Sequence, residues 1–306
     1  MGIHYNKLFQ LAKEKGLNKT MLRERAGISS ATMAKLSKNE MVGLEVIEKL
    51  CRCLNCQPGD VMSYVVKTEN RLLNTLREEK NMNLKGGIYH MTQIKLSYNS
   101  NRIEGSRLSE DQTRYIFETN TIGMENESTV NIDDIIETTN HFDAFKYLLD
   151  VAEEPLTEVM IKEFHRILKA GTSDSRKEWF RVGDYKLKPN MVGDIETSAP
   201  EDVEADVREL LRSYERRGER TFDDIIDFHY RFERIHPFQD GNGRVGRLIM
   251  FKECLRWNQI PVLIEDSFKQ FYYRGLKEYL REPGYLRDTC LHGQDVYGGL
   301  VEYFRV

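Results

Sequence analysis

The chain has 306 residues, with 45 lysines and arginines against 49 aspartates and glutamates and a hydrophobic fraction of 40%. This length favours two domains that each bury a core. The sequence has no run of eighteen apolar residues, no apolar N-terminal stretch typical of a secretory signal and only five cysteines, so we expect a soluble protein of the reducing cytoplasm without a membrane partner.

Residues 1–66 carry ten basic and six acidic side chains, a balance of +4, whereas the remaining residues carry 35 and 43, a balance of −8. Such an asymmetry indicates a module that faces nucleic acid beside a neutral or acidic domain. The spacing of apolar residues predicts short helices in this module, at 7–15, 19–26, 30–38 and 44–54. Gly27 supplies the turn between the second and third helices, and Ser29 or Ser30 caps the third.

This pattern resembles the Cro/repressor-type helix-turn-helix, most closely in the stretch LRERAGISSATMAKLSKNE. The resemblance implies that the third helix enters the major groove of DNA. Its base-facing side chains are then Ser30, Thr32 and Lys35, and Lys38 faces phosphate. One such domain reads only a half-site, so specific binding requires a homodimer. Because the charge is modest, a protein-interaction or dimerisation module remains the alternative.

Residues 67–95 are charged, and we expect them to form a helical linker to a second domain over 96–306. Only seven prolines interrupt the chain, and long amphipathic stretches recur after the linker, at 111–118, 133–152, 157–170 and 200–217. The expected fold is therefore mainly α, with an N-terminal helix-turn-helix domain of four or five helices followed by an all-helical core.

One β-hairpin is expected within this helical core, between residues 179 and 200. Polar and apolar residues alternate around Tyr185–Leu187 and around Met191–Val192. Between them, Pro189–Asn190 is a turn signal. The pattern predicts two short strands joined at that turn.

Ser100 and Glu104 lie one turn apart on the same face of a predicted helix, which Gly105 can end. Ser109 and Gln112 then have the spacing of a capping box that opens the next helix. Taken alone, this pattern is also typical of an ordinary exposed helix end.

The segment most indicative of function is HPFQDGNGRVGR, residues 236–247. A helix predicted over 222–235 cannot continue through Pro237, so His236 stands at its C-terminal edge. Imidazole has an unperturbed pKa near physiological pH, and its neutral form can accept a proton from an attacking hydroxyl.

The second half of this segment has the composition of a phosphate site. Gly241 and Gly243 allow the backbone around Asn242 to turn its N–H groups toward an anion. A helix follows directly, and its N-terminus favours phosphate. Arg244 and Arg247 share one face of that helix and can grip phosphate oxygens in a bidentate way.

These residues resemble the Fic family motif, H-x-F-x-[DE]-G-N-G-R-x-x-R, at each of its fixed positions. The resemblance covers roughly residues 95–290 and implies transfer of AMP from ATP to a Tyr, Thr or Ser hydroxyl of a target protein. By this match His236 is the general base and Asp240 holds Mg²⁺, a role that suits a carboxylate beside substrate phosphates. The nucleotide then lies against Asp240, Gly241, Asn242, Gly243, Arg244, Val245, Gly246 and Arg247.

Ser100 and Glu104 resemble the Fic inhibitory motif, [ST]-x-x-x-E-[GN]. The resemblance implies that Glu104 pairs with Arg247 and occupies the guanidinium that should hold the γ-phosphate. A charge-assisted pair of this kind is strong and geometrically selective. In some relatives the same glutamate positions water to remove AMP from modified targets, so the direction of the reaction stays open.

The resemblance also implies a flap and an adenine pocket. The flap hairpin adds a target segment as an extra strand and brings Val192, Gly193, Asp194 and Ile195 beside the nucleotide. The pair Tyr272–Tyr273 resembles the tyrosines near the adenine pocket of relatives. A purely structural hairpin and an aromatic core stripe are the alternatives.

Three functions remain open on the sequence. The first is an autoinhibited protein adenylyltransferase with a DNA-binding module, and the second is a transcriptional regulator whose nucleotide site senses ATP with little transferase activity. The third is an AMP-removing hydrolase that uses the same site. A base at position 236 favours chemistry over sensing, because a pure binding site needs none.

Overall fold

The computed structural model describes residues 2–65, 69–123, 129–192, 195–216 and 218–306. The chain divides into two compact units, Met1–Glu69 and Asn70–Val306. Among the described residues, no helix is both long and apolar enough to cross a membrane.

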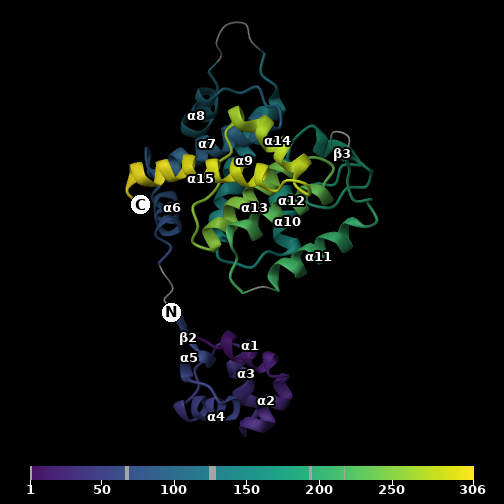
Figure 1. The fold of residues 1–306 in the computed structure, drawn as a ribbon. Coiled ribbons are helices and arrows are strands. Elements are labelled where there is room, and N and C mark those ends of the chain that lie inside the picture. Colours follow the sequence, from purple (N-terminus) through teal and green to yellow (C-terminus); the bar gives the residue numbers. More distant parts are fainter. Residues whose placement is uncertain (1, 66–68, 124–128, 193–194, 217) are drawn as a thin grey trace. The chain divides into compact units, whose positions relative to one another are not determined.

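The smaller unit contains short helices and a two-stranded antiparallel sheet (Figure 1): β1 (Gly2–His4), α1 (Asn6–Glu14), α2 (Lys19–Ala26), α3 (Ser30–Ser37), α4 (Leu44–Leu54), α5 (Pro58–Val61) and β2 (Ser63–Val65). The four helices predicted in this segment lie within one residue of their expected bounds. Gly27, with φ +62°, ends α2 in the left-handed conformation, and the Ser29 side chain accepts from the backbone N of Thr32 to cap α3. The pairing of β1 with β2 was not predicted.

The larger unit is helical apart from one hairpin among its described residues, which confirms the mainly α class. Its elements are α6 (Arg71–Met82), α7 (Ile88–Ile103), α8 (Glu110–Thr119), α9 (Ile132–Asp150), α10 (Glu158–Lys169), η1 (Asp174–Arg176), β3 (Met191–Val192), β4 (Ile195–Glu196), α11 (Val203–Glu215), α12 (Phe222–Ile235), α13 (Asn242–Arg256), η2 (Asp266–Phe268), α14 (Lys269–Glu278) and α15 (Gly284–Phe304).

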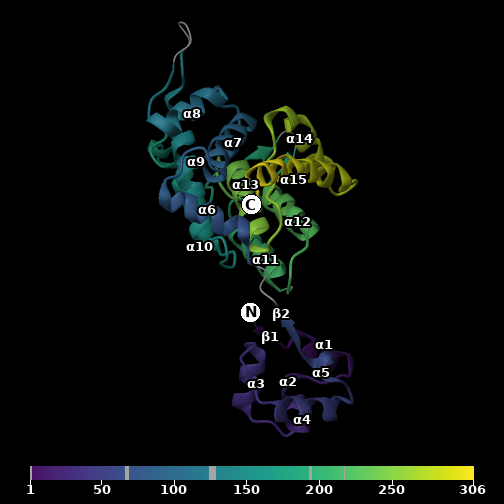
Figure 2. The same cartoon turned by 90° about the vertical axis from the view of Figure 1, so that its left-hand side faces the viewer.

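Helix α13 is the central element of the larger unit. All of its residues from Asn242 to Leu255 are buried, and it packs against α7, α9, α10 and α12 (Figure 1). Helix α8 lies at one end of this unit, beside α7 and α9 (Figure 2). A helix surrounded on all sides must be apolar or carry polar groups that find partners. The arginines near the start of α13 are therefore expected to have specific partners.

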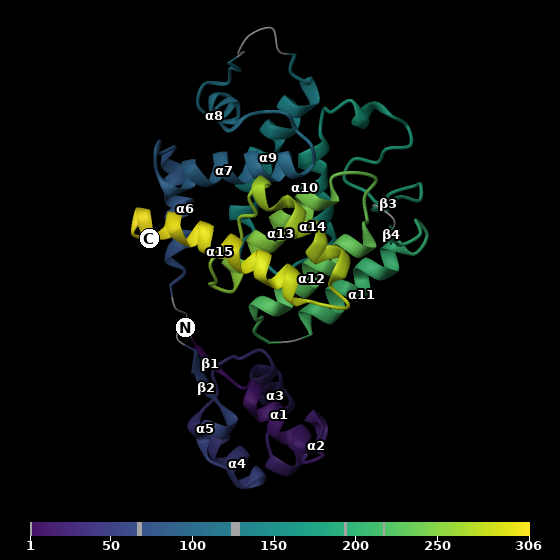
Figure 3. The same ribbon diagram turned by 45° about the horizontal axis from the view of Figure 1, so that its top comes forward.

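The hairpin forms with one of the two predicted strands, because Met191–Val192 is β3, but the partner of this strand is β4. Met191 pairs with Glu196 and Val192 with Ile195, at one side of the larger unit (Figure 3). The prediction of a strand at Tyr185–Leu187 and a turn at Pro189–Asn190 was wrong. The backbone N of Lys186 donates to the carbonyl of Pro237 (2.9 Å), so this segment bonds to the loop after α12 instead of to β3.

The segment expected as a linker contributes to the larger unit from Asn70 onward. Asn70 caps α6, and its Nδ2 also donates to the carbonyl of Leu255 at the end of α13. Arg77 donates to the carbonyl of Leu149 (2.8 Å) in α9. The start of α6 lies beside the C-terminal end of α15, where Arg71 donates to the carbonyl of Arg305 (Figure 1).

Two glycines of α15 provide a matched test of its packing. A Cβ at Gly293 would lie 2.7 Å from Val262 Cγ1 and 3.1 Å from the carbonyl oxygen of Leu263, whereas a Cβ at Gly299 would meet nothing within 4 Å. Gly293→Ala is expected to lower the free energy of unfolding by about 1–3 kcal/mol through overpacking. Gly299→Ala is expected to raise it by about 0.5–1 kcal/mol through helix propensity.

Differential scanning calorimetry of the whole chain measures this difference in the transition of the larger unit. For a domain of this size, each kcal/mol corresponds to a change of about 2–4 °C in Tm. Equal shifts in the two variants would contradict the close approach of α15 to the 262–263 segment.

Candidate active site

The site begins where α12 ends. Thr221 and Asp224 form a capping box that starts this helix, and His236 ends it in the left-handed conformation with φ +52°. Pro237 stops the helix because it has no N–H to donate. A short loop then leads to Gly241, whose φ of +84° starts α13. The C-terminus of one helix and the N-terminus of the next therefore meet across residues 237–241.

Asn242 closes this loop from within. Its Oδ1 accepts from the backbone N of Phe238 (2.8 Å), and its Nδ2 donates to the carbonyl of the same residue (2.9 Å). The side chain is buried. The first backbone bond of α13 runs from Val245 N to Gly241 O, so the N–H groups of residues 242–244 have no acceptor within the helix. Such a group of donors at a helix N-terminus favours an anion.

The imidazole of His236 is neutral at physiological pH. Burial lowers its pKa to about 4, and the ammonium of Lys186 acts in the same direction, while the carboxylates of Glu104 and Asp240 oppose both. A neutral imidazole beside an anion-binding helix end can accept a proton from a nucleophile that approaches the anion.

Asp240 is an anion held by two cations. Its Oδ2 accepts from Lys169 Nζ (2.7 Å) and from a guanidinium nitrogen of Arg244 (3.1 Å). Burial raises the pKa of Asp240, but Arg244 and Lys169 outweigh burial and hold this pKa well below its usual range. Both cations also contact Glu137, each at 2.5 Å. Lys169 Nζ also lies 3.6 Å from Asp174 Oδ2, so the network contains two buried cations and three carboxylates.

Lys169 and Glu137 were not predicted from the sequence. Lys169 is the last residue of α10 and is only 1% exposed, and Glu137 comes from α9. A lysine in the last turn of an amphipathic helix is usually a solvated charge that complements the helix dipole. No local pattern therefore distinguished this one, since the two carboxylates to which its ammonium donates hydrogen bonds are 32 and 71 residues away in sequence.

The Arg247 guanidinium of α13 is bound by residues at the end of α7. Its Nε donates to Ser100 Oγ (3.1 Å), and its Nη2 donates to the Ser100 carbonyl (2.9 Å) and to Glu104 Oε1 (2.7 Å). The pair expected between Glu104 and Arg247 is therefore present. The Arg247 side chain is 4% exposed and that of Glu104 27% exposed, so the pair is accessible from the Glu104 side.

Gly243 makes this approach of Glu104 sterically allowed. A Cβ at position 243 would lie 2.3 Å from Glu104 Oε1 and 2.9 Å from Arg247 Nη1. Any side chain at position 243 would therefore conflict with the observed position of the carboxylate. Glycine at this position both opens the backbone to an anion and admits Glu104.

Two regions of the chain match known families. Residues 155–254 match the Fic/DOC family, and residues 7–67 match the Cro/C1-type HTH DNA-binding domain. A region similar to the Cro/C1-type helix-turn-helix domain is thus followed in this chain by a region similar to the Fic/DOC family.

Curated relatives of the Fic/DOC region are named protein adenylyltransferase Fic. The relative from Nematostella vectensis is 27% identical over 196 residues, which cover 61% of this chain and 42% of the relative. The relative from Drosophila melanogaster is 30% identical over 185 residues, which cover 59% of this chain and 36% of the relative. The chain thus spans less than half the length of these relatives.

Solved structures share the fold. A Fic domain containing signaling protein from Bacteroides thetaiotaomicron has a TM-score of 0.57 at 24% identity, and the match covers 76% of this chain and 90% of that chain. Fic-1 from C. elegans has a TM-score of 0.58 at 18% identity, and the match covers 96% of this chain and 92% of that chain. At these identities the likeness concerns the fold alone.

The hairpin of the Fic/DOC region is joined to the 237–241 loop through Asn190. Asn190, immediately before β3, donates from Nδ2 to the carbonyl of Phe238 (3.0 Å). Of the predicted flap residues, Val192 lies in β3 and Ile195 in β4, while Gly193 and Asp194 lie outside the described residues. Their roles at the nucleotide stay predictions.

The tyrosine pair lies near Arg247. Tyr272 is buried, its hydroxyl is 2.8 Å from His229 Nε2, and its ring centroid is 5.8 Å from the Arg247 guanidinium. The Tyr273 hydroxyl donates to the carbonyl of Ile103 (3.0 Å), one residue before Glu104. Tyr273 therefore contacts the end of α7, and Tyr272 lies beside Arg247, while contact of either ring with adenine stays a prediction.

Asp240 fits a magnesium ion that arrives with a triphosphate. No group of three or more His, Cys, Asp or Glu side chains with a metal-binding arrangement occurs in the described part of the chain. Mg²⁺ usually binds through one or two carboxylates plus substrate phosphates and water. A single anionic carboxylate from the protein, next to the candidate phosphate site, is therefore sufficient. Both cationic contacts of Asp240 fall on Oδ2.

In the helix-turn-helix domain, the predicted DNA-facing residues differ in availability. The Ser30 hydroxyl accepts from Arg23 (3.0 Å), and the Thr32 hydroxyl lies 2.9 Å from that of Ser29. Lys35 and Lys38 are exposed to solvent. The two lysines are therefore the more accessible candidates for contacts to DNA.

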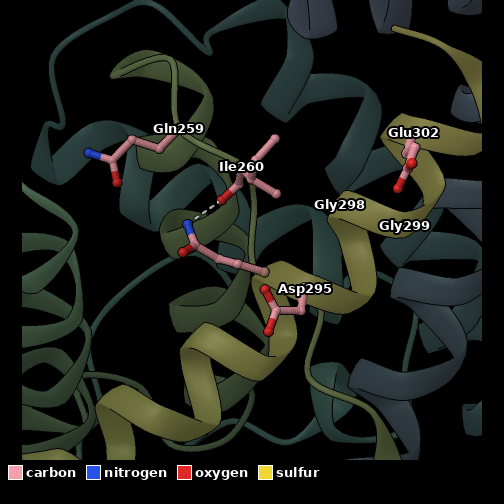
Figure 4. A pocket seen from close by; sticks show the side chains of 7 residues that line it. Gln259, Ile260, Asp295, Gly298, Gly299 and Glu302 are labelled. Carbon is pink, nitrogen blue, oxygen red and sulfur yellow. Dashed lines mark hydrogen bonds between the residues drawn. The ribbon is translucent and has the colours of Figure 1, made fainter.

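A separate cavity of about 590 Å³ lies between the segment after α13 and helix α15 (Figure 4). Gln294 Nε2 donates to the carbonyl of Ile260 (2.6 Å). The cavity contains none of the residues predicted to bind nucleotide. Its lining consists of Gln259, Ile260, Gln294, Asp295, Gly298, Gly299 and Glu302.

Proposed function

We propose that this chain is an autoinhibited protein adenylyltransferase that transfers AMP from ATP to a Tyr, Thr or Ser hydroxyl of a target protein. One observation carries the proposal: the neutral imidazole of His236 belongs to the residue directly after α12, and a short loop leads from it to the N-terminus of α13, which presents unpaired N–H groups and two arginines. The match to the Fic/DOC family and the names of the curated relatives support it.

The residues divide the reaction among them. The hydroxyl oxygen of the target attacks the α-phosphorus of ATP, and its proton passes to His236. The bond from the α-phosphorus to the oxygen that bridges to the β-phosphate breaks, and pyrophosphate leaves. The N–H groups of residues 242–244 stabilise the charge that develops on the α-phosphate. Magnesium held by Asp240 would neutralise negative charge on the phosphates when bound.

The same geometry accounts for a brake. Arg247, which the proposal assigns to the γ-phosphate, is bound to Glu104 and to Ser100. A γ-phosphate must replace the Glu104 carboxylate to reach this guanidinium. ATP that binds without this contact has no anchor for its outer phosphates, and its α-phosphorus is not held in line for attack.

An AMP-removing hydrolase is the second candidate function, because the partly exposed Glu104 carboxylate lies within the same site and can orient a water molecule. Sensing of ATP without chemistry is disfavoured by the neutral base. A target already modified with AMP distinguishes the hydrolase, which releases AMP from it and needs Glu104 to do so.

The position of the label identifies the reaction. The whole chain, with the brake relieved by Glu104→Gly, is incubated with Mg²⁺ and ATP labelled either at the α- or at the γ-phosphate. Covalent labelling of protein from α-labelled ATP alone is the expected result. Labelling from γ-labelled ATP, or no labelling from either, would reject AMP transfer.

We also propose that the helix-turn-helix domain binds DNA, supported by the family match and by two exposed lysines, Lys35 in α3 and Lys38 directly after it. Lys38→Ala is expected to weaken binding to a duplex and to reduce the slope of log K against log salt by about 0.9, the value for one phosphate contact. Lys49→Ala, an equally exposed lysine on α4, is the matched control. Absence of salt-dependent binding by the native chain would favour a protein-interaction module.

A further inference from the structure

Lys186 carries a positive charge into the interior of the Fic/DOC region. It is only 3% exposed, and its ammonium donates to three neutral oxygens: Asn190 Oδ1 (2.7 Å), Thr197 Oγ1 (2.7 Å) and the carbonyl of Ile235 (3.4 Å). Burial lowers its pKa to about 8. A buried charge is costly unless its hydrogen bonds are satisfied, and an apolar side chain would avoid the cost.

Two of these oxygens belong to opposite ends of the hairpin. Asn190 immediately precedes β3, and Thr197 immediately follows β4. Thr197 Oγ1 also donates to the carbonyl of Asn190 (2.9 Å). The ammonium of Lys186 therefore joins the base of the hairpin on both sides.

The remaining contacts reach the loop that carries His236. The ammonium contacts the carbonyl of Ile235, the backbone N of Lys186 donates to that of Pro237 (2.9 Å), and Asn190 Nδ2 donates to that of Phe238 (3.0 Å). These carbonyls lie on either side of position 236. One lysine and its immediate partner thus connect the hairpin to the backbone on both sides of the imidazole.

We propose that Lys186 is a positioning residue that fixes the hairpin to the His236 loop, so that a segment held by the hairpin meets the base in a defined geometry. The expected effect of Lys186 on the reaction rate rests on the proposed AMP transfer. The physical link between hairpin and loop does not depend on that reaction and is measurable without it.

The charge of Lys186 also acts on the base. The charged groups that influence His236 are Lys186 from the segment before β3, Glu104 from the end of α7 and Asp240 from the loop itself. Lys186 is the cation among them, and it disfavours the protonated imidazole. Removing it raises the pKa of His236 from about 4, so that less neutral base is present at acidic pH.

The test uses the whole chain with Glu104→Gly, so that self-labelling is measurable. Lys186→Met is expected to slow labelling by about 10- to 100-fold, the loss typical of a misplaced reacting group, and to move the acid limb of the pH–rate profile upward. Lys186→Arg keeps the charge and restores most of the rate. The matched control is Lys188→Met, the same change at an exposed lysine two residues away. It is expected to leave the labelling rate and the acid limb unchanged.

Amide hydrogen exchange provides a readout independent of activity. Lys186→Met is expected to accelerate exchange in residues 190–192, 195–197 and 235–239, and Lys186→Arg is not. If Glu104→Gly alone shows no labelling, the proposed function fails while exchange still tests the link. The positioning role is overturned if the labelling rate, the acid limb of the pH–rate profile and the amide exchange rates of Lys186→Met all equal those of the Glu104→Gly parent. It is also overturned if the acid limb does not move and Lys186→Arg does not restore the labelling rate.

Discussion

Replacing Glu104 by glycine is expected to raise the rate of AMP incorporation by about 10- to 100-fold. The Glu104 carboxylate has no catalytic role in the proposed mechanism. Its Oε1 accepts from Arg247 Nη2 (2.7 Å), and this guanidinium is the group proposed to bind the γ-phosphate. A hydrogen bond to a charged group contributes about 1.5–3 kcal/mol, and each 1.4 kcal/mol corresponds to a factor of ten. Glycine is suitable because residue 104 lies just beyond the end of α7, where helix propensity matters little. Initial rates of transfer from α-labelled ATP measure the effect.

Glu302→Gly is the matched control, since this glutamate is exposed near the end of α15, away from the proposed site. It is expected to leave the rate unchanged. The affinity for ATP, measured by equilibrium dialysis, should rise in Glu104→Gly, because the γ-phosphate no longer competes with a carboxylate for Arg247. An unchanged rate of transfer together with an unchanged affinity for ATP would contradict autoinhibition by Glu104.

Replacing His236 by alanine is expected to reduce transfer by about 10²- to 10⁴-fold, the range for a positioned general base. The measurement is made in the chain that also carries Glu104→Gly, so that the loss starts from a high rate. His292→Ala, at a half-exposed histidine of α15, is the control. ATP binding should persist in His236→Ala, since the phosphate contacts come from α13. A loss of binding as large as the loss of rate would assign His236 to folding or binding.

The pH dependence of the rate follows from the same residue. Because the pKa of His236 is lowered to about 4, the imidazole is neutral, and competent as a base, across the neutral range. The rate should fall only as the pH drops through this pKa and the ring becomes protonated. An acid limb near pH 6.5, the unperturbed value, would mean that the buried, lysine-facing environment of His236 does not persist in the working enzyme.

The network around Asp240 fits this division of roles. Lys169 and Arg244 keep the carboxylate ionised and fix its Oδ2, and Glu137 balances their charge. A carboxylate held in this way would need little reorganisation free energy to bind a metal and phosphates, and such preorganisation is a main source of electrostatic catalysis. The network also explains how two cations are tolerated in the interior beside α13.

Elements encoded by neighbouring residues were predictable. The helices of the first 54 residues, the end of α12 at His236 and the start of α13 after Gly241 depend on caps, prolines, glycines and apolar spacing within a few positions. The motif of residues 236–247 is contiguous, so its base, anion site and arginines could be recognised together. Pairing of Glu104 with Arg247, 143 residues apart, was expected only because of the family resemblance.

Features that join distant segments were decided by the tertiary structure. The strands β1–β4 span two or three residues each, which gives little local signal for their partners. The segment predicted to pair with β3 instead donates from the backbone N of Lys186 to the Pro237 carbonyl. The burial of Lys169 and Lys186 had no local signal, because a lysine is buried only where acceptors from other segments surround its ammonium. Sequence alone thus indicated which groups are candidates for chemistry, and long-range packing decided which charges surround them.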